Sequence, residues 1–431
     1  MILSVILGIP CSQQIENFKP QSKSGKRKMS SRKIQGLPIY LQMMILQAMG
    51  SFNTSSYAPL NIFLKADFLL NAAQVGLITG FTFIGTIFTS FLSGILVDRI
   101  GPRNTLAISF ASFGLASFTA FLASSYYVIL LAYVILGAGY GMVTPSTNSS
   151  IMHHYSPNHV RPMGIKQTGV PIGAIFSAVL LPFVATHFSV GVSYLVILLV
   201  SVVALFSMIF GKDSSPQPVI KSAISREELK NVFRNRTLIT ISAVAAFLAW
   251  SQQTVLSYYV IFNESGGTSV YVAEIMLAIL LFGSISGRII WTFSSNWILG
   301  GNLIRIFSLI VFLSGTFVIL IPFSAGNMFL AIPLALALGM TTVAWNSTYV
   351  TIISEVASKG QVGIFSGLSL TILYTGAIIG TPLSGFIVDF TNSFVQMWLA
   401  VGTALLVLSV TLTLTAKRLR LDYQAERVYK I

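Results

Sequence analysis

Lys166 is the residue of this sequence whose type and position point most directly to chemistry. It stands about one and a half helical turns inside an apolar stretch, 161–186, and Gln167 follows it. A charge in the middle of a membrane costs at least about 2.5–3.5 kcal/mol, so its presence suggests a functional reason. An ammonium group there can bind an anion. The alternative is that the side chain reaches out to the membrane interface.

Other titratable residues lie near the ends of apolar stretches. None of the four acids Asp98, Glu274, Glu355 and Asp389 stands at the centre of a stretch. An exporter of cationic drugs usually has such an acid, so the pattern weighs against that function. His153 and His154 offer a route for a coupling proton, although adjacent interfacial histidines are usually solvated.

The sequence shows no residue pattern typical of an enzyme. It has no Ser-His-Asp, metal-binding or glycine-rich phosphate motif, and its one cysteine, Cys11, excludes a disulfide framework. A polytopic acyl or glycosyl transferase is the alternative from another class. It would need a polar catalytic cluster in a loop, whereas the longest internal loop is a basic linker. We therefore expect no enzymatic activity and no cofactor.

Composition places the candidate residues in membrane helices. Of the 431 residues, 54% are hydrophobic and 9% are charged, against roughly 25% charged in soluble proteins. A spanning helix needs about 20 apolar residues. The sequence predicts six spans and then six more, at roughly 36–58, 73–96, 104–123, 126–152, 161–186 and 189–211, and at 237–262, 269–293, 302–323, 326–354, 361–388 and 394–415.

The net charge of +14 predicts the orientation of these spans rather than binding to nucleic acid. Basic residues gather on the cytoplasmic side of short loops. With both chain ends inside, the basic clusters lie on that side and Lys65 alone falls outside. We therefore expect a multi-pass protein of the plasma or inner membrane with both termini cytoplasmic, weakly attracted to anionic lipid.

The predicted organisation has five parts. They are a basic cytoplasmic tail, 1–35; a six-helix half, 36–211; a cytoplasmic linker, 212–236; a second six-helix half, 237–415; and a basic tail, 416–431. Two interpretations fit residues 1–28: an upstream start that is mis-assigned, with Met29 as the true start, or a tail. In the linker, Ser225 and Glu228 form a capping-box pattern that predicts a short helix on the inner membrane surface.

Pairs of glycines four residues apart predict where helices approach closely. They are Gly76/Gly80, Gly137/Gly141, Gly169/Gly173, Gly283/Gly287 and Gly376/Gly380. Four of these pairs fall on spans 2, 5, 8 and 11, which indicates a repeating three-helix unit. A second repeat supports two related halves, because Gly141 and Asn148 are spaced as Gly339 and Asn346 are.

A loop motif between spans 2 and 3 identifies a family. Gly94-Ile-Leu-Val-Asp98-Arg99-Ile-Gly101-Pro-Arg103 resembles the G-x-x-x-D-R-x-G-x-R/K signature of the major facilitator superfamily. In physical terms, Gly94 permits close helix contact, Gly101 permits a tight turn, and Asp98 accepts from a helix amino end or an arginine. The alternative is a plain solvated turn.

The second half carries a degenerate copy of this motif. It begins at Gly287-Arg288, with Asn296 in place of the aspartate and Trp297 in place of the arginine. We assign Gly94, Asp98, Arg99, Gly101, Arg103 and Arg288 to gating. Arg288 either pairs with the first half or extends to the inner interface. In span 5, Arg161 to Gly173 is similar to the corresponding stretch of cyanate-permease-like bacterial permeases, and this fixes no substrate.

The family resemblance implies an all-α fold of twelve helices in two halves around a central cavity. It also implies that spans 1, 4, 7 and 10 line this cavity, so neutral polar and aromatic residues there become candidates. Each of them alone is as well explained by a hydrogen bond between helices. We assign substrate binding to Lys166, Gln167, Asn148, Trp250, Gln252, Trp345 and Asn346.

These observations predict a secondary permease that moves a small organic or inorganic anion by alternating access. Its partners are then a small-molecule substrate, a coupling proton and the lipid bilayer, with the monomer as the functional unit. The alternative within transport is an efflux antiporter for drugs or metabolites. The residues alone do not distinguish import from export.

Overall fold

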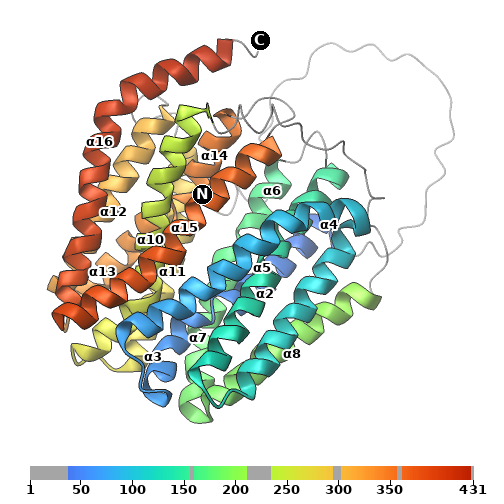
Figure 1. Ribbon diagram of the computed structural model, residues 1–431, viewed down its shortest axis with the longest axis vertical. Helices are drawn as coiled ribbons and strands as arrows, with labels where there is room; N and C mark the ends of the chain where they lie inside the picture. The colour runs from blue at the N-terminus through green and yellow to red at the C-terminus, as the bar shows by residue number, and fades with distance from the viewer. Residues whose placement is uncertain (1–36, 156–159, 211–233, 295–301, 357–361, 429–431) are drawn as a thin grey trace, which may run out of the picture. The chain divides into compact units, whose positions relative to one another are not determined.

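Backbone pairing explains why the apolar stretches of this chain form helices. In hydrocarbon no water is present to pair with N–H and C=O groups, and a helix pairs all of them within one segment. The computed structural model describes residues 37–155, 160–210, 234–294, 302–356 and 362–428 (Figure 1). The helices are α2 (Ile39–Thr54), α3 (Tyr57–Asp67), α4 (Ala72–Phe121), α5 (Tyr126–Tyr155), α6 (Val160–Gln167), α7 (Gly169–His187), α8 (Val190–Phe210), α10 (Arg236–Ser265), α11 (Val270–Ser294), α12 (Leu303–Ser324), α13 (Met328–Leu338), the π-helix η2 (Gly339–Val343), α14 (Asn346–Val356), α15 (Val362–Thr391) and α16 (Phe394–Val428).

Twelve membrane spans are present, as the sequence predicted. In the described part of the chain, 11 segments are long and apolar enough to cross a membrane. The remaining span is made by α2 and α3, which have 16 and 11 residues and are individually short. All of these helices belong to one compact unit, Ile39–Ile431. Below, α2–α8 are called the first set and α10–α16 the second set.

The first span is longer than predicted and is broken. The expected range was 36–58, whereas α3 continues to Asp67 after a turn at Ser55 and Ser56. Pro59 explains the break, because its ring clashes with the carbonyl of residue 55 and supplies no N–H to it. The break turns the side chain of Tyr57 toward the second set, where it becomes part of a pocket.

The fifth span is broken in the same way. Helix α6 ends at Gln167 and α7 begins at Gly169, with Thr168 between them. Pro171 stands four residues after Gln167, so it removes the hydrogen bond that would continue α6. The span predicted at 161–186 is present as Pro162–His187, and the turn at Thr168 within it was not predicted.

A π-helix interrupts the tenth span. Between α13 and α14, the N–H of Ala344 donates to the carbonyl of Gly339 at 3.1 Å, a bond that spans five residues. Short π segments often occur at functional sites, because they reorient the residues that follow. Trp345 and Asn346 follow this π-helix, after Ala344.

Helix α16 runs beyond the predicted end of its span at 415 and reaches Val428. The part predicted as a basic tail, 416–431, thus continues the last helix as far as that residue. Its sequence, Ala416-Lys-Arg-Leu-Arg-Leu, contains strong helix formers and neither Gly nor Pro. The linker helix predicted at Ser225 lies outside the described residues.

Glycines bring equivalent pairs of helices together in the two sets. A Cβ on Gly137 of α5 would stand 1.8 Å from the carbonyl oxygen of Thr82 on α4, and one on Gly283 of α11 would stand 2.4 Å from that of Leu336 on α13. These are spans 2 and 4 in one set and 8 and 10 in the other. Each glycine therefore permits backbone contact that any side chain would prevent.

A second pair of contacts repeats between the sets. Gly173 of α7 lies against Ala48 of α2, where a Cβ would come within 1.9 Å of the Ala48 carbonyl oxygen, and Gly376 of α15 lies against Ala246 of α10, where the distance would be 1.8 Å. Spans 5 and 1 thus match spans 11 and 7. This agreement is the relation that a sequence repeat predicts.

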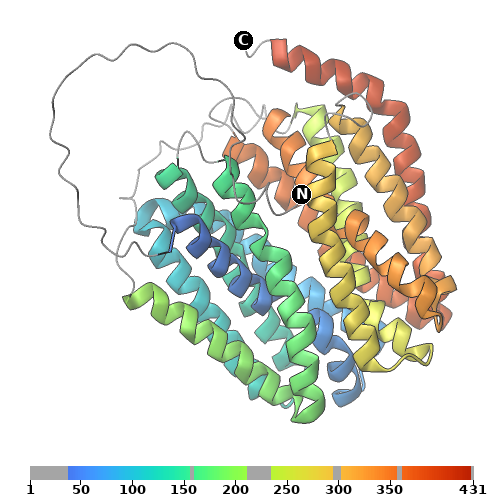
Figure 2. The same cartoon turned by 180° about the vertical axis from the view of Figure 1, so that it is seen from behind.

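The two sets meet along α4 and α15. These helices run side by side in Figures 1 and 2. A Cβ on Gly76 would come within 2.6 Å of the carbonyl oxygen of Thr381, and one on Gly80 within 3.1 Å of that of Ile378, so these two glycines of α4 permit contact between the sets. Farther along, the rings of Phe83 and Tyr374 stack with centroids 5.3 Å apart. Helices α7 and α11 form a second contact between the sets.

Candidate substrate-binding site

A pocket of about 90 Å³ lies between the two sets of helices. Its polar lining comes from both sets. A solute in this pocket therefore contacts both, as alternating access requires when two sets move against each other around a site. The polar and aromatic residues that line it are Ser51, Thr54, Ser55, Tyr57, Phe83, Tyr140, Gln252, Gln253, Ser284 and Arg288.

Three of the predicted site residues meet at Gln252 of α10, which lines the pocket. The indole nitrogen of Trp345 donates to the side-chain oxygen of Gln252 at 2.9 Å, and the amide nitrogen of Asn346 donates to the same oxygen at 3.3 Å. The π-helix brings these two residues to α10. Spans 7 and 10 therefore contribute together, as the family resemblance implied.

Gln253 is the next residue of α10 and also lines the pocket. Its side-chain oxygen accepts a short hydrogen bond from the hydroxyl of Tyr57, which belongs to the first set. The bond is buried, and its two residues are 196 positions apart in the chain. It thus ties the two sets together at the edge of the pocket. Neither residue was among our predicted site residues, although both were noted as neutral polar groups on spans 1 and 7.

Arg288 of α11 lines the pocket together with Tyr140 of α5. From the sequence we assigned Arg288 to gating, with the inner membrane interface as its alternative position. The structure places it in the pocket between the sets. Lys166 was selected because a charge within an apolar stretch is costly. Arg288 also lies within an apolar stretch, so the same cost identifies it in the sequence as a candidate for substrate binding.

Lys166 and Asn148 come together, but not in the pocket. The ammonium nitrogen of Lys166 on α6 donates to the side-chain oxygen of Asn148 on α5 at 2.7 Å. Lys166 is 0% exposed. Neither residue lines the pocket described above, and Gln167 is partly buried at the end of α6. The pair joins two adjacent spans of the first set, beside the site.

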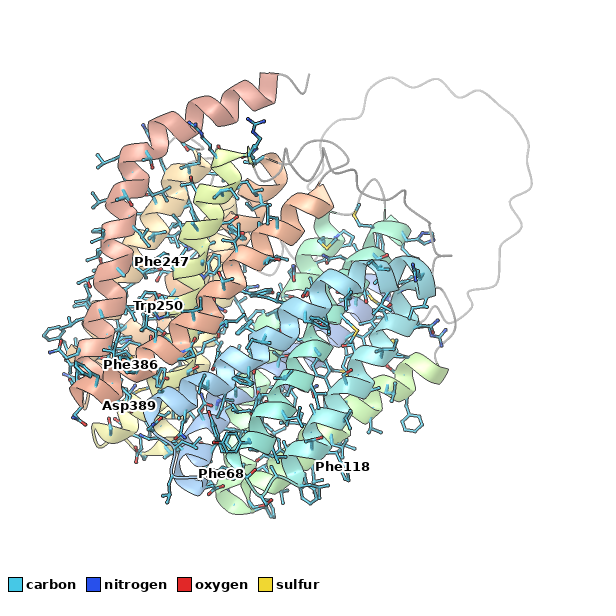
Figure 3. All side chains as sticks on the ribbon, in the orientation of Figure 1. Phe68, Phe118, Phe247, Trp250, Phe386 and Asp389 are labelled. Atoms are coloured by element: carbon cyan, nitrogen blue, oxygen red, sulfur yellow. The ribbon has the colours of Figure 1, made fainter. Side chains whose placement is uncertain are left out.

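Trp250 of α10 is not part of the pocket lining. Its indole nitrogen donates to the hydroxyl of Ser384 on α15 at 2.8 Å, and its ring packs where a Cβ on Gly380 would stand 2.2 Å away (Figure 3). Phe247 lies beside it with ring centroids 5.8 Å apart. This arrangement gives Trp250 a packing contact between spans 7 and 11.

Outside the pocket lining, hydrogen bonds join the two sets where α4 begins and α15 ends. The carboxylate of Asp389, at the end of α15, accepts from the N–H groups of Ala72 and Ala73, each at 2.8 Å (Figure 3). These are the first residues of α4, whose free N–H groups and positive dipole end favour a carboxylate. The hydroxyl of Tyr258 donates to the carbonyl of Ala72 at 2.7 Å. We call this region, Ala72, Ala73, Tyr258 and Asp389, the sealed end.

Further bonds between the sets lie between the sealed end and the pocket. The hydroxyls of Thr79 on α4 and Ser257 on α10 are 2.7 Å apart, and the side-chain nitrogen of Asn61 on α3 donates to the Ser257 carbonyl at 3.4 Å. Because hydroxyl and amide groups bond here without competing water, they hold the sets together. Opening this end requires that all of these bonds break.

The loop motif is partly described. Gly101 has φ 83° and ψ 161°, a conformation that side-chain-bearing residues rarely adopt, so the predicted tight turn is confirmed. The guanidinium of Arg103 donates to the carbonyl of Met208 on α8 at 2.6 Å, and Arg99 is exposed. The side chain of Asp98 and residues Asn296 and Trp297 lie outside what the structure describes.

Gly94 does not serve the purpose we expected. A Cβ at this position would have nothing within 4 Å, so Gly94 makes no close contact with another helix in this conformation. Gly94 is exposed on the outside of α4. The close contact expected of Gly94 is absent in this conformation, and its assignment to gating stays a prediction.

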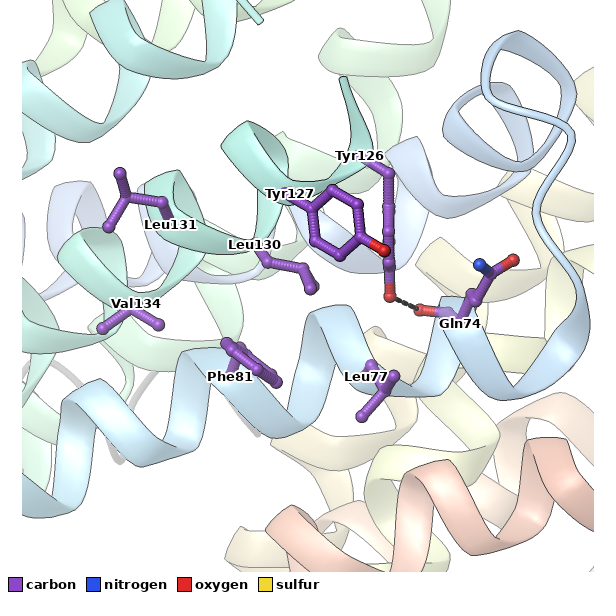
Figure 4. Close-up of a pocket in the computed structure, with 8 residues that line it drawn as sticks. All are labelled: Gln74, Leu77, Phe81, Tyr126, Tyr127, Leu130, Leu131 and Val134. Carbon is purple, nitrogen blue, oxygen red and sulfur yellow. Dashed lines mark hydrogen bonds between the residues drawn. The ribbon is translucent and has the colours of Figure 1, made fainter.

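A larger groove, of about 470 Å³, opens on the outer surface between α4 and α5 (Figure 4). The hydroxyl of Tyr126 donates to the carbonyl of Gln74 at 2.7 Å along one edge. The other lining residues are mainly apolar, Leu77, Phe81, Leu130, Leu131 and Val134. A wide apolar groove with so few polar groups suits lipid chains better than a polar solute.

Similarity to known proteins agrees with this architecture. The chain is 25% identical over 391 residues to the hexuronate transporter of Bacillus subtilis (strain 168), covering 85% of this chain and 91% of that protein. It is 24% identical over 351 residues to monocarboxylate transporter 13 of Rattus norvegicus, covering 79% of each.

A solved structure of a bacterial homolog of the human lysosomal transporter Spinster superposes with a TM-score of 0.69 at 15% identity, covering 91% of this chain and 98% of that one. At this identity the likeness concerns the fold alone. The family model of the Major Facilitator Superfamily matches residues 43–381, most of the chain. The protein therefore belongs to the Major Facilitator Superfamily, as a multi-pass membrane protein and a secondary transporter of small molecules.

Proposed function

We propose that this protein transports a small organic or inorganic anion and binds it in the pocket between the two sets of helices. One observation carries the proposal: Arg288 lines that pocket among neutral polar groups. A guanidinium stays protonated under all physiological conditions and presents its N–H groups in a geometry that matches a carboxylate. An anionic solute in the pocket lies beside this positive charge, and the two attract each other strongly in a medium of low dielectric constant.

Lys166 adds a second positive charge on span 5, four residues before Val170, which lines the pocket. Its ammonium group is bonded to the neutral oxygen of Asn148, so that bond leaves the charge uncompensated. In a medium of low dielectric constant such a charge acts over a longer distance than in water. In this proposal Arg288 contacts the anion, and Lys166 raises the positive potential of the route toward it.

The relatives support an anionic substrate. Hexuronates and monocarboxylates are both carboxylates, and these names belong to the two relatives described above. Residues 43–381 match the family model, and the names of these two relatives support the substrate class as part of the proposal. No mid-membrane acid among the described pocket residues favours a cation.

The proposal includes an orientation in the cell membrane. Basic residues of the linker, of both tails and of the loop at Arg99 and Arg103 belong on the cytoplasmic side. The sealed end then faces outward, and the conformation described here is inward-facing. The division into halves at 36–211 and 237–415, function as a monomer and coupling to a proton are parts of the same proposal.

Uptake into proteoliposomes tests the anion proposal. Purified protein, reconstituted with and without a proton gradient, would be supplied with radiolabelled carboxylates, including hexuronates and short monocarboxylates, and with amines and neutral sugars of similar size. We expect uptake of a carboxylate, loss of that uptake in Arg288→Gln and partial retention in Arg288→Lys. Uptake of amines or neutral sugars, with Arg288→Gln as active as the wild type, would contradict the proposal.

A further inference from the structure

The hydrogen-bond polarity of Gln252 is set by its neighbour. The indole nitrogen of Trp345 can only donate, so the atom of Gln252 that lies 2.9 Å from it must be the side-chain oxygen. Trp345 is 1% exposed, and it therefore holds this arrangement without competition from water. The two N–H groups of Gln252 are then left as donors on the side that lines the pocket.

Gln253 has the same polarity. Its side-chain oxygen accepts from the hydroxyl of Tyr57, which leaves its amide N–H groups as donors. Among the residues that the structure describes, no protein atom accepts from the side-chain nitrogen of either glutamine. Both line the pocket with Arg288, whose guanidinium also only donates. Gln252, Gln253 and Arg288 therefore present hydrogen-bond donors to the pocket, whereas the Ser284 hydroxyl of the same set uses its proton on the carbonyl of Leu281 at 2.6 Å.

The α2 side of the pocket has the opposite polarity. The hydroxyl of Ser51 donates to the carbonyl of Val170 at 2.7 Å, and the hydroxyl of Thr54 donates to the carbonyl of Gly50 at 2.9 Å. Each hydroxyl has one proton, so the proton is used and the oxygen keeps its lone pairs. Ser51 and Thr54 therefore face the pocket as acceptors.

We infer that the pocket selects a hydroxylated carboxylate in one orientation, with its carboxylate on Gln252, Gln253 and Arg288 and a hydroxyl group donating to Ser51 or Thr54. Trp345 is a positioning residue, because it fixes Gln252 as a donor and does not itself line the pocket. This inference rests on the proposed transport of an anion and adds to it the substrate's second group and its direction. A neutral polyol lacks the charge, and a plain carboxylate lacks the donor.

Matched probes of two sizes test this inference. The purified full-length protein would be titrated, by calorimetry and by thermal stabilisation, with D-glucuronate, cyclohexanecarboxylate and D-glucose, and with lactate, propionate and propane-1,2-diol. The three compounds of each triad are similar in size. The second compound lacks the hydroxyl groups, and the third keeps hydroxyl groups but lacks the carboxylate. We expect the hydroxycarboxylate of at least one triad to bind about tenfold more tightly than both of its analogues, since each lost bond leaves a buried polar group unpaired.

Two tryptophan variants separate positioning from packing. Trp345→Phe removes the indole donor and lets the Gln252 amide rotate, and the neighbouring Asn346 amide can rotate with it. We expect the preference for the hydroxycarboxylate over its uncharged analogue to fall by about tenfold. Trp291→Phe is the control, because the Trp291 indole nitrogen donates to the carbonyl of Met340 at 2.6 Å and not to a pocket amide. It should keep the wild-type preference.

Gln252→Glu supplies an independent variant. Glutamate has the same shape as glutamine but replaces the two N–H donors with an acceptor oxygen, so this variant should lose the preference for carboxylates. The melting temperature of the variant shows whether it folds. Equal binding of the hydroxycarboxylate and the plain carboxylate in both triads, or an unchanged preference in Trp345→Phe and Gln252→Glu, would overturn the inference and leave anion transport intact. Binding of no carboxylate by the wild type would overturn both.

Discussion

The ammonium group of Lys166 donates a hydrogen bond to the side-chain oxygen of Asn148 across 2.7 Å. These residues belong to α6 and α5 and are 18 positions apart in the chain. Because Lys166 is fully buried, the Asn148 oxygen takes the place of a water molecule at the ammonium group. The pair shows how a polar residue on one span makes a lysine on the next span tolerable in the membrane.

The first prediction concerns the charge of this pair. Lys166→Gln should lower the affinity for the transported anion by about tenfold, the factor that corresponds to about 1.4 kcal/mol, whereas Lys166→Arg should keep part of the affinity. Asn148→Asp should also lower it, because a carboxylate would neutralise Lys166 in place. The measurement is the KM for uptake together with the melting temperature of the purified variants. Stable variants with unchanged KM would show that Lys166 serves packing alone.

The second prediction concerns the sealed end. Asp389→Ala removes both bonds to the first turn of α4, each of which is a hydrogen bond to a charged group, so the closed form of this end should lose on the order of 1–3 kcal/mol. A cysteine introduced at Ala58 in the pocket, in a Cys11→Ser background, should then react faster with an impermeant thiol reagent added outside the cell. Asp67→Asn is the control, because Asp67 is exposed at the end of the neighbouring α3. Equal labelling of all three proteins would show that Asp389 does not hold this end closed.

The third prediction concerns the turn at Gly101, between spans 2 and 3 on α4. Gly101→Val should slow transport and lower the melting temperature, since a β-branched residue at φ 83° costs about 1–3 kcal/mol. Gly94→Ala should leave the melting temperature unchanged, because its Cβ would meet nothing within 4 Å. Asp98→Ala should slow transport while the protein remains in the membrane. If Gly101→Val and Asp98→Ala both transported at the wild-type rate, the loop would be only a turn.

The fourth prediction concerns orientation. In a Cys11→Ser background, Ser265→Cys at the end of α10 should react with an impermeant thiol reagent in intact cells. Ser214→Cys, in the basic linker, should react only after the cells are permeabilised, because basic loops stay in the cytoplasm. The reverse pattern of labelling would refute the proposed topology and would make the described conformation outward-facing.

The sequence alone determined the number of spans and the family. Lengths of apolar stretches are local properties, since a membrane of fixed thickness needs about 20 residues from each helix. The turn at Gly101 was also local, because one residue's backbone conformation requires glycine there. The glycine pairs predicted close contacts correctly, although the sequence did not show that Gly76 and Gly80 join the two sets.

The tertiary structure decided which polar residues share a site. Arg288 and Lys166 are equally costly charges in the sequence, yet one lines the pocket and the other bonds to Asn148. Trp250 and Trp345 are alike in type, yet one donates to Ser384 away from the pocket and the other to Gln252. The direction of a side chain depends on helix rotation, and on breaks such as those at Pro59 and in η2. Helix rotations and the directions of side chains are set by contacts between distant segments, so a short stretch of sequence does not determine them.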